Sequence, residues 1–367
     1  MRFLNISQIH FLGNRFKRVI CLLRLQLTSI ATLGSHCALQ VLKGAKDEGF
    51  QTLLVCEKKR ESLYRRFSFI DELILVDSFS EILTDECQSK LKEKNAILVP
   101  HGTLISQMSS DEIESISVPI FGNKWILRWE SDRVMKEKLM LESNLNVPKS
   151  VKNPKDITNL VIAKRNGAAG GKGYFMASSE DEYNRKRDKL IDEGLIQGDS
   201  DLYLQEYHSG VLAYLQFFYS PITGELEFFG VDKRHESDIE GLGRIPAKEQ
   251  LDMDEIPSFN VIANSPLVLR ESLLEKVYSM GESFVEASKR LVSPGMNGPF
   301  CIEGVYDQDA NFFTFEFSAR IVAGTNIFME GSPYTALLYD EPMSMGRRIA
   351  REIKIAETKN SLEKIVT

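Results

Sequence analysis

The chain has 367 residues, of which 43% are hydrophobic and 26% are charged. This length and ordinary composition predict a globular protein of two or three lobes, each large enough to bury a core. The 52 acidic residues outnumber the 45 basic ones, which gives a net charge of −7. The balance argues against nucleic acid or an anionic membrane surface as the main partner, and an anionic substrate would need a local cluster of Lys and Arg.

The cysteines and the N-terminus bear on the cellular compartment. Five cysteines form no C-x-x-C pair, and the five histidines show no metal-ligand spacing. Such scattered thiols are typical of a reduced, cytoplasmic protein without a disulfide framework or a zinc site. The apolar run VICLLRLQL is interrupted by Arg24 and is too short to span a bilayer. We therefore expect residues 1–28 to be an N-terminal extension, and we expect no membrane partner.

From Ser29 onward, short apolar runs alternate with helical patterns. SIATL, FQTLLVCE, DELILVD and NAILVPHG predict strands, and the stretches between them predict helices. This alternation is typical of an α/β fold with a parallel sheet, in which ligands bind at the carboxyl ends of the strands. Two strand ends carry a histidine beside a hydroxyl side chain, namely Ser35 with His36 and His101 with Thr103. They predict either a substrate site or merely turns with helix caps.

A glycine-rich loop follows a later predicted strand. The stretch KRNGAAGGKGYF, residues 164–175, comes directly after the apolar run NLVIA. Glycine allows the backbone to approach a ligand closely but costs conformational entropy, so bound phosphate is the natural candidate. The loop matches neither G-x-x-x-x-G-K-[ST] nor the dinucleotide-binding fingerprint. An amphipathic helix with the sequence ESDRVMKEKLMLESNLNVP precedes this unit, and a strand in DLYLQEYHSG follows it.

The stretch FCIEGVYDQDANFFTFEFSAR predicts a hairpin with two opposed carboxylates. A two-residue loop at 309–310 places Glu303 opposite Glu316 and Tyr306 opposite Phe313. Alternation then places three aromatic side chains on the core face: Phe313, Phe315 and Phe317. Directly opposed carboxylates repel one another, and a divalent cation offsets this repulsion, since Mg²⁺ binds through one or two carboxylates plus substrate phosphates. A solvated acidic face with Lys or Arg nearby is the alternative.

Taken in chain order, these motifs resemble the ATP-grasp superfamily. The resemblance implies an α/β protein with an ATP-grasp fold, an N-terminal parallel-sheet domain, and ATP and Mg²⁺ (or Mn²⁺) as cofactors. It implies that the lysine before the glycine-rich loop, and the loop itself, contact the phosphates of ATP. It also implies that the QEY segment frames the adenine ring. The implied ATP-binding residues are Arg133, Lys164, Gly170, Gly171, Lys172, Gly173, Glu206 and Tyr207. The implied metal ligands are Glu303 and Glu316.

A narrower resemblance covers the chain from about residue 30 to its end. The stretches IATLGSHCALQVLKGAKDEGF, VPHGTL, GNKWILRWESDR, GAAGGKGYFMASS and FEFSARIVAGTN are similar to archaeal 5-formaminoimidazole-4-carboxamide ribonucleotide (FAICAR) synthetases. That family implies formylation of the 5-amino group of 5-aminoimidazole-4-carboxamide ribonucleotide (AICAR) by ATP and formate, through formyl phosphate, in purine (IMP) biosynthesis. It also implies a homo-oligomer. The implied catalytic residue is Arg320, and the implied substrate-binding residues are Ser35, His36, His101, Thr103, Arg234 and Asn326.

The resemblance implies domains at 29–125 and 126–367, with a lid at about 155–210. Two positions depart from the family pattern. Ala169 stands where the loop usually has another basic residue, and Ser318 stands where the superfamily usually has Asn two residues after the second glutamate. These departures leave two alternatives open, namely an ATP-grasp carboxylate–amine ligase with another substrate and a nucleotide-binding paralogue without catalysis.

Overall fold

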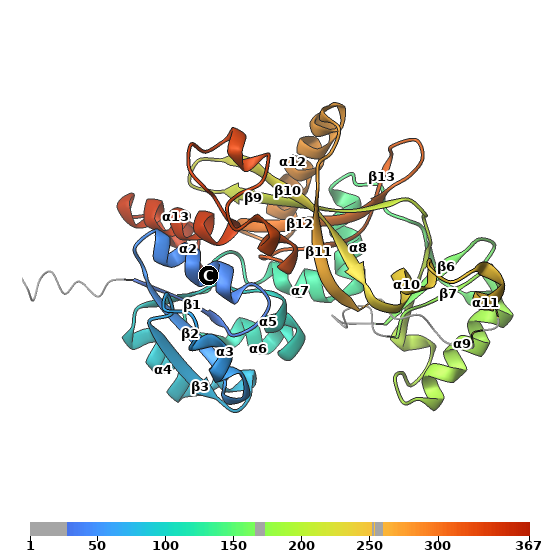
Figure 1. Ribbon diagram of the computed structural model, residues 1–367, viewed down its shortest axis with the longest axis horizontal. Coiled ribbons are helices and arrows are strands. Elements are labelled where there is room, and N and C mark those ends of the chain that lie inside the picture. Colours follow the sequence, from blue (N-terminus) through green and yellow to red (C-terminus); the bar gives the residue numbers. More distant parts are fainter. Residues whose placement is uncertain (1–27, 166–172, 252, 254–259) are drawn as a thin grey trace, which may run out of the picture.

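The computed structural model describes residues 28–165, 173–251, 253 and 260–367. Within these ranges the strands form three sheets. Figure 1 shows the N-terminal sheet at the left, the largest sheet at the upper centre, and a small sheet with its helix at the right.

The N-terminal sheet is parallel, with the strand order β3-β2-β1-β4. Its strands are β1 (Ser29–Leu33), β2 (Gln51–Glu57), β3 (Glu72–Val76) and β4 (Ala96–Leu98). The helices of this part are α2 (Ala38–Asp47), α3 (Glu61–Tyr64), α4 (Asp85–Glu93), α5 (Gly102–Gln107) and α6 (Ser110–Ser115). All of β1 is buried, as expected for a central strand with helices on both faces. The predicted parallel sheet is confirmed.

Two helices lead from this sheet to the small sheet. They are α7 (Ile126–Ser131) and α8 (Arg133–Glu142). Asp132 lies between them, and its carboxylate accepts a hydrogen bond from the Met135 amide at 2.8 Å, which caps the start of α8. The small sheet has the order β5-β8-β6-β7 and carries one helix. Its elements are β5 (Ser150–Val151), β6 (Val161–Arg165), β7 (Phe175–Ala177), α9 (Glu180–Asp192) and β8 (Leu202–Glu206).

The largest sheet is antiparallel, with the strand order β11-β10-β9-β12-β13. Its strands are β9 (Val211–Ser220), β10 (Glu225–Glu236), β11 (Val261–Leu267), β12 (Gly298–Tyr306) and β13 (Phe312–Ser318). The remaining helices are α10 (Ser237–Leu242), α11 (Ala247–Leu251), α12 (Leu274–Leu291) and α13 (Met345–Thr358). The hairpins predicted around Gly224 and before Phe312 are both present, as β9–β10 and β12–β13.

The C-terminal helix returns to the N-terminal sheet, and α13 lies alongside α2 (Figure 1). The two helices cross at glycines. A Cβ atom on Gly44 would lie 2.1 Å from the amide nitrogen of Arg347, and one on Gly346 would lie 2.2 Å from the carbonyl oxygen of Gln40. The final residue, Thr367, exchanges backbone hydrogen bonds with Ile120. The C-terminus is therefore packed against the first half of the chain.

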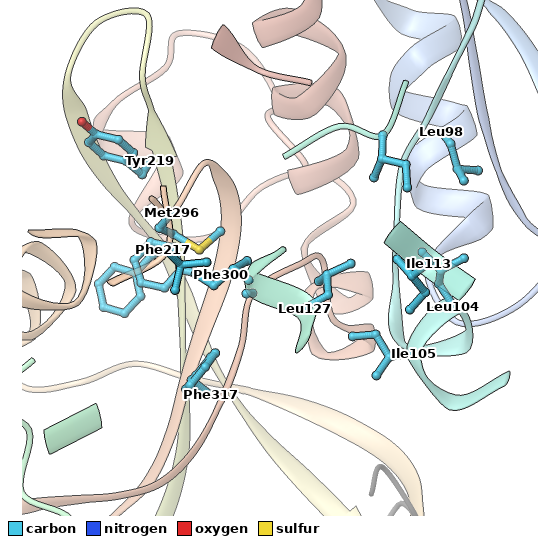
Figure 2. Close-up of a cluster of buried hydrophobic side chains, with 14 of the residues drawn as sticks. Leu98, Leu104, Ile105, Ile113, Leu127, Phe217, Tyr219, Met296, Phe300 and Phe317 are labelled. Carbon is cyan, nitrogen blue, oxygen red and sulfur yellow. The ribbon is translucent and has the colours of Figure 1, made fainter. Parts of the chain in front are cut away.

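One hydrophobic cluster extends from the N-terminal sheet to the largest sheet. Figure 2 shows Leu127 of α7 between Leu104 and Ile113 on one side and Phe300 and Phe317 on the other. All five side chains are buried. The two halves of the chain thus share a core. Among the described residues, none of the helices has the length and apolar composition that a membrane crossing requires.

Candidate active site

Two glutamates face one another across the β12–β13 hairpin. Glu303 pairs directly with Glu316, as the sequence predicts. Glu303 is 3% exposed, and its Oε2 lies 2.9 Å from Nη1 of Arg234 on β10. Ser318 donates a hydrogen bond of 2.7 Å to Oε1 of the same carboxylate. The guanidinium of Arg234 also stacks on the ring of Tyr214, 3.8 Å from its centroid, so Glu303 belongs to a tightly constrained pair of charges.

Nearer the loop the predicted register is wrong, because the connection is not the predicted two-residue loop: the Asp307 amide bonds to the carbonyl of Asn311. A bulge in β13 offsets this difference, so the predicted register holds from Glu303 back to Cys301. The register shifts between Glu303 and Gly304, so that Tyr306 pairs with Phe312 instead of Phe313. A bulge adds one residue to one strand and reverses the alternation beyond it. The three phenylalanines predicted for the core face therefore divide. Phe317 is in the core and is joined there by Phe312, whereas Phe315 lies under the Lys164 ammonium and Phe313 stacks on His208.

The carboxylate of Glu316 is surrounded by cations. Lys136 contacts Oε1, and Nη1 of Arg133 lies 3.5 Å from Oε2. Arg133 and Lys136 are three residues apart on α8 and so share one face of the helix. Burial alone would raise the pKa of Glu316, but Lys136, Arg133 and Lys164 hold it well below its usual value. The sequence analysis predicted Arg133 and missed Lys136.

Lys164 is buried at the end of β6. Its ammonium donates a hydrogen bond of 2.9 Å to Oε1 of Gln205 and lies 5.0 Å from the centroid of the Phe315 ring. The other amide atom of Gln205 donates to the carbonyl of Pro148 at 3.1 Å, which orients the side chain. Burial lowers the pKa of Lys164 to about 7, and the nearby Glu316 opposes this effect. The lysine therefore changes charge in the physiological pH range.

The glycine loop is only partly within the described residues. Gly170, Gly171, Lys172 and the departing Ala169 lie outside them. Gly173 has a φ of +78°, and a Cβ atom there would lie 2.7 Å from Cδ of Arg165, so the position requires glycine. The next residue, Tyr174, accepts a hydrogen bond of 2.8 Å from Nη2 of Arg133. Arg133 thereby connects the end of the loop to Glu316.

The residues predicted to frame adenine lie at the end of β8. Glu206 is the last residue of the strand and is half-buried, and its amide bonds to the carbonyl of Lys149. Tyr207 follows it, is 39% exposed, and donates its amide to the carbonyl of Leu160. Both residues neighbour Gln205, the partner of Lys164. Their contact with adenine stays a prediction.

The predicted strand-end residues form one cluster on the N-terminal sheet. The imidazole Nδ1 of His36 lies 2.8 Å from the hydroxyl of Thr103 and 3.2 Å from that of Ser35. His101 donates from Nε2 to the carbonyl of Leu33 at 2.8 Å and accepts at Nδ1 from the amide of Thr103. The two imidazole rings stack with centroids 5.5 Å apart. The sequence pattern alone did not decide between a cap and a site, and His101 does cap α5.

Both histidines are neutral at pH 7. Burial, followed by the charges of Arg320 and Arg60, lowers the pKa of His36 to about 4. Burial likewise lowers the pKa of His101 to about 3. His36 also has a φ of +45°, an unusual backbone conformation for a residue with a side chain. The cluster therefore offers uncharged hydrogen-bonding groups next to arginine side chains.

Arg320 lies between this cluster and Glu130 of α7. Its Nη2 lies 2.8 Å from Oε1 of Glu130 on α7, and Oε2 of Glu130 accepts from the amide of Ala319 at 2.8 Å. A Cβ atom added to Gly102 would lie 3.6 Å from Cζ of Arg320 and 3.0 Å from Nε2 of His36, so the three groups are close together. Glu130 was not predicted from the sequence.

Asn326 closes the same cluster from the other half of the chain. It lies in the 3₁₀ turn Ala323–Phe328, and its side-chain amide donates to the carbonyl of His36 at 3.1 Å. The backbone of His101 also bridges that of Ile321. The predicted residues of both halves are thus brought together. Arg234 lies instead beside the glutamate pair.

The donor set fits a metal that is shared with phosphate. No three His, Cys, Asp or Glu side chains within the described ranges are grouped so that they could hold a metal ion by themselves. Glu303 and Glu316 supply two opposed carboxylates. Mg²⁺ is commonly bound by one or two carboxylates together with substrate phosphates and water. These two residues would hold such an ion only with a polyphosphate in place.

Comparison with known proteins identifies the family. A protein from Nitrosopumilus maritimus (strain SCM1) is 71% identical over 341 residues, which make up 93% of this chain and 100% of that protein; it is named 5-formaminoimidazole-4-carboxamide-1-(beta)-D-ribofuranosyl 5'-monophosphate synthetase. The chain belongs to this family. Residues 182–367 match a domain of unknown function, DUF1297, and residues 30–151 match a protein of unknown function, DUF1246. The predicted FAICAR synthetase family and ligase class are confirmed.

Solved structures of similar fold support the assignment to this family. The crystal structure of the IMP biosynthesis protein PurP from Thermococcus kodakaraensis has a TM-score of 0.74 and 29% identity, and it covers 92% of this chain and 100% of that one. The biotin carboxylase domain of the Hydrogenobacter thermophilus 2-oxoglutarate carboxylase, in complex with MgADP, has a TM-score of 0.63. It is 16% identical and covers 89% of this chain and 70% of that one, so it shows the fold alone. The predicted ATP-grasp fold is confirmed.

Proposed function

We propose that this protein is a ligase that uses ATP and formate to formylate the 5-amino group of AICAR, giving FAICAR, ADP and phosphate on the route to IMP. Its relatives are named for the synthesis of this product. The observation that carries the proposal is the spacing of Ser318 and Arg320. Ser318 contacts Glu303, and Arg320 reaches the His36 cluster. Two extended residues span about 7 Å, so the proposed phosphate side and the proposed acceptor side of the site are adjacent.

The reaction needs two displacements. An oxygen of formate attacks the γ-phosphorus of ATP, ADP leaves, and formyl phosphate forms. The amine of AICAR then attacks the carbonyl carbon and loses a proton, and phosphate leaves with the bridging oxygen. The protein contributes mainly by positioning the reactants and neutralising charge. Arg133, Lys136 and Lys164 converge on the place where a polyphosphate would lie next to Glu316.

The remaining site residues would orient the formyl group and AICAR. The guanidinium of Arg320 is held by Glu130 and can hydrogen-bond a carboxylate or acyl oxygen. Ser35, His36, Thr103 and Asn326 offer polar groups to AICAR. His101 is already hydrogen-bonded through both ring nitrogens, so we propose that it supports the neighbouring residues of the AICAR site and does not itself bind AICAR.

The metal and the loop complete the proposed site. Bound between Glu303 and Glu316, Mg²⁺ or Mn²⁺ would supply positive charge to the transferring phosphoryl group. The glycine loop would close over the phosphates and exclude water, which would otherwise hydrolyse formyl phosphate. We further propose the domain division at residue 125, the lid at about 155–210, a homo-oligomer, and a cytoplasmic location. The four cysteines among the described residues are all buried free thiols, which agrees with a reducing compartment.

Phosphate release from ATP in the presence of Mg²⁺, formate and AICAR tests this function. Release should require all three additions, and Glu316→Gln should abolish it because the amide removes the charge of a metal ligand without changing its size. The matched control is Glu86→Gln, on the exposed face of α4, which should release phosphate at the rate of the unaltered protein.

Other outcomes would identify the alternatives. Release that needs AICAR but is indifferent to formate would indicate a ligase for a different acid. Tight ATP binding without any release would indicate a non-catalytic paralogue. Either outcome would contradict the proposed reaction, and Ser318 and Ala169 would then be the first positions to restore to the family pattern.

A further inference from the structure

Lys136 is a buried lysine whose partner is one of the two proposed metal ligands. It is 5% exposed and lies on the buried stripe of α8, which continues with Leu139 and Met140. A lysine on such a stripe is rare, because a buried ammonium loses its hydration and needs a counter-charge. That counter-charge is the carboxylate of Glu316, which Lys136 contacts directly.

The contact occupies a carboxylate that the reaction needs for another purpose. Oε1 of Glu316 is bonded to Lys136, and Oε2 faces Arg133 at 3.5 Å. A divalent cation that approached Glu316 would meet two positive side chains at short range. Because Lys136 is enclosed, its ammonium has no route to bulk water that would relieve this repulsion.

A polyphosphate removes the conflict. It brings several negative oxygens to the same place, and an ammonium can move from the carboxylate to a phosphate oxygen by rotation of its flexible side chain. Arg133 and Lys164 border the same space, since both act electrostatically on Glu316. The site without nucleotide therefore has more positive than negative charge around Glu316.

We propose that Lys136 is the counter-ion of Glu316 in the absence of nucleotide and transfers to the polyphosphate when nucleotide and metal bind together. This inference rests on the proposed function, because it requires a nucleotide and a metal at this site. It makes binding of the two cooperative, since each ligand removes an obstacle to the other, and the coupling must be equal in both directions. This exchange of partners by Lys136 would keep metal ions from occupying the site without nucleotide.

Binding of Mn²⁺, followed by electron paramagnetic resonance of the free ion, tests the proposal. Titrations are made on the full chain with and without adenylyl imidodiphosphate, a non-hydrolysable ATP analogue. We expect Lys136→Met to tighten Mn²⁺ binding without nucleotide about tenfold and to reduce the coupling between Mn²⁺ and nucleotide by a similar factor. The direct affinity of Mn²⁺ for the analogue is the same in both cases and cancels in the comparison.

Four further variants make the result specific. Lys138→Met lies on the exposed face of the same helix and should bind as the unaltered protein does. Lys136→Arg keeps the charge and should keep the coupling. If Lys136→Met does not fold, Lys136→Gln, which retains a polar end, takes its place. Glu316→Gln should lose Mn²⁺ binding under both conditions.

The outcomes separate this proposal from the proposed function. If the Lys136 variants bind Mn²⁺ with unchanged affinity and unchanged coupling, the lysine is only structural and the proposal is wrong, while the nucleotide–metal site stands. If the unaltered protein binds neither the analogue nor Mn²⁺ with the analogue present, the proposed function fails and the proposal fails with it.

Discussion

The charge of Lys164 depends on pH near neutrality. Burial lowers its pKa to about 7, and phosphate oxygens would favour the charged form and raise the pKa again. Above pH 7 the free protein has lost this proton and the nucleotide complex has regained it. Nucleotide binding at about pH 8 should therefore take up a proton, and affinity should fall as the pH rises from 7. Calorimetric titrations of ADP in two buffers of different ionisation enthalpy measure this uptake.

Lys164→Arg is the control for that prediction. A guanidinium stays charged throughout this pH range, so binding to this variant should take up no proton. An equal uptake in Lys164→Arg would assign the proton to another group and contradict the account of Lys164.

Glu130 positions Arg320, and its removal tests that role. Glu130→Gln leaves the shape intact but removes a buried negative charge, 2.8 Å from the guanidinium. A hydrogen bond to a charged group contributes about 2 kcal/mol, so kcat/KM for formate should fall by roughly 30-fold. Steady-state phosphate release with varied formate measures this. The control is Glu114→Gln, which breaks a more exposed ion pair with Arg128, a residue of the helix that carries Glu130. This variant should change kcat/KM little. An equal loss of kcat/KM in Glu114→Gln would contradict a specific role for Glu130.

Sequence reasoning identified the residues of this site that belong to recognisable motifs. It predicted the opposition of Glu303 and Glu316 from a two-residue loop, and the pair is present because a bulge in β13 offsets the different connection between the strands. It missed Lys136, Glu130 and Gln205, which act through other side chains. Lys136 had one available signal, namely its place three residues after Arg133 and before the apolar Leu139, on the side of the helix that had to be buried.

At the scale of elements, the crossing of α2 and α13 depends on two glycines. Gly346→Ala would force a Cβ atom to within 2.2 Å of the carbonyl oxygen of Gln40, so the helices would have to separate. We expect a loss of about 1–3 kcal/mol in the free energy of unfolding, as for other overpacked interfaces. Urea unfolding followed by circular dichroism measures it.

Gly241→Ala is the matched control for the helix crossing. It lies in α10, and a Cβ atom there would meet nothing within 4 Å. Alanine favours a helix over glycine, so this variant should be neutral or slightly stabilising. If Gly346→Ala were equally neutral, the close crossing would not limit stability.

The bulge in β13 is a feature of a strand that could not be predicted from the sequence. Strand positions follow from apolar alternation, which is a local property, whereas the pairing of Glu303 with Glu316 also depends on the bulge. A bulge depends on how the strand must bend to meet its neighbours. Phe315 reads as a core residue in the sequence, yet it lies beneath Lys164. No local pattern distinguishes it from Phe317.

At the scale of the whole molecule, a shared core joins the two halves of the site. Leu127 lies between the N-terminal sheet and the largest sheet (Figure 2). Leu127→Ala should cost about 3 kcal/mol, and because the core is continuous, all probes of unfolding should shift together. Far-ultraviolet circular dichroism and tryptophan fluorescence, recorded during thermal unfolding, compare these probes. A shift confined to one of two separate transitions would mean that the halves unfold independently.

The parallel N-terminal sheet follows from the order of strands and helices in the sequence, and the ATP-grasp fold follows from the resemblance of the motifs to that superfamily. The return of α13 to α2 does not, since the amphipathic pattern of 345–358 predicts a helix without naming its partner. The position of Arg320 between Glu130 and His36 depends on that assembled arrangement. The arrangement of the proposed site thus depends on the whole chain.

Transfer of oxygen from formate to phosphate tests whether formate is activated as formyl phosphate. The protein is incubated with ATP, Mg²⁺, AICAR and formate labelled with ¹⁸O at both oxygens, and the released phosphate is examined by ³¹P nuclear magnetic resonance. Attack of formate on the γ-phosphorus predicts one ¹⁸O atom in each phosphate and the other in the formyl group of FAICAR. Phosphate released without ¹⁸O would show that formate never bonds to phosphorus, and the proposed mechanism would be wrong.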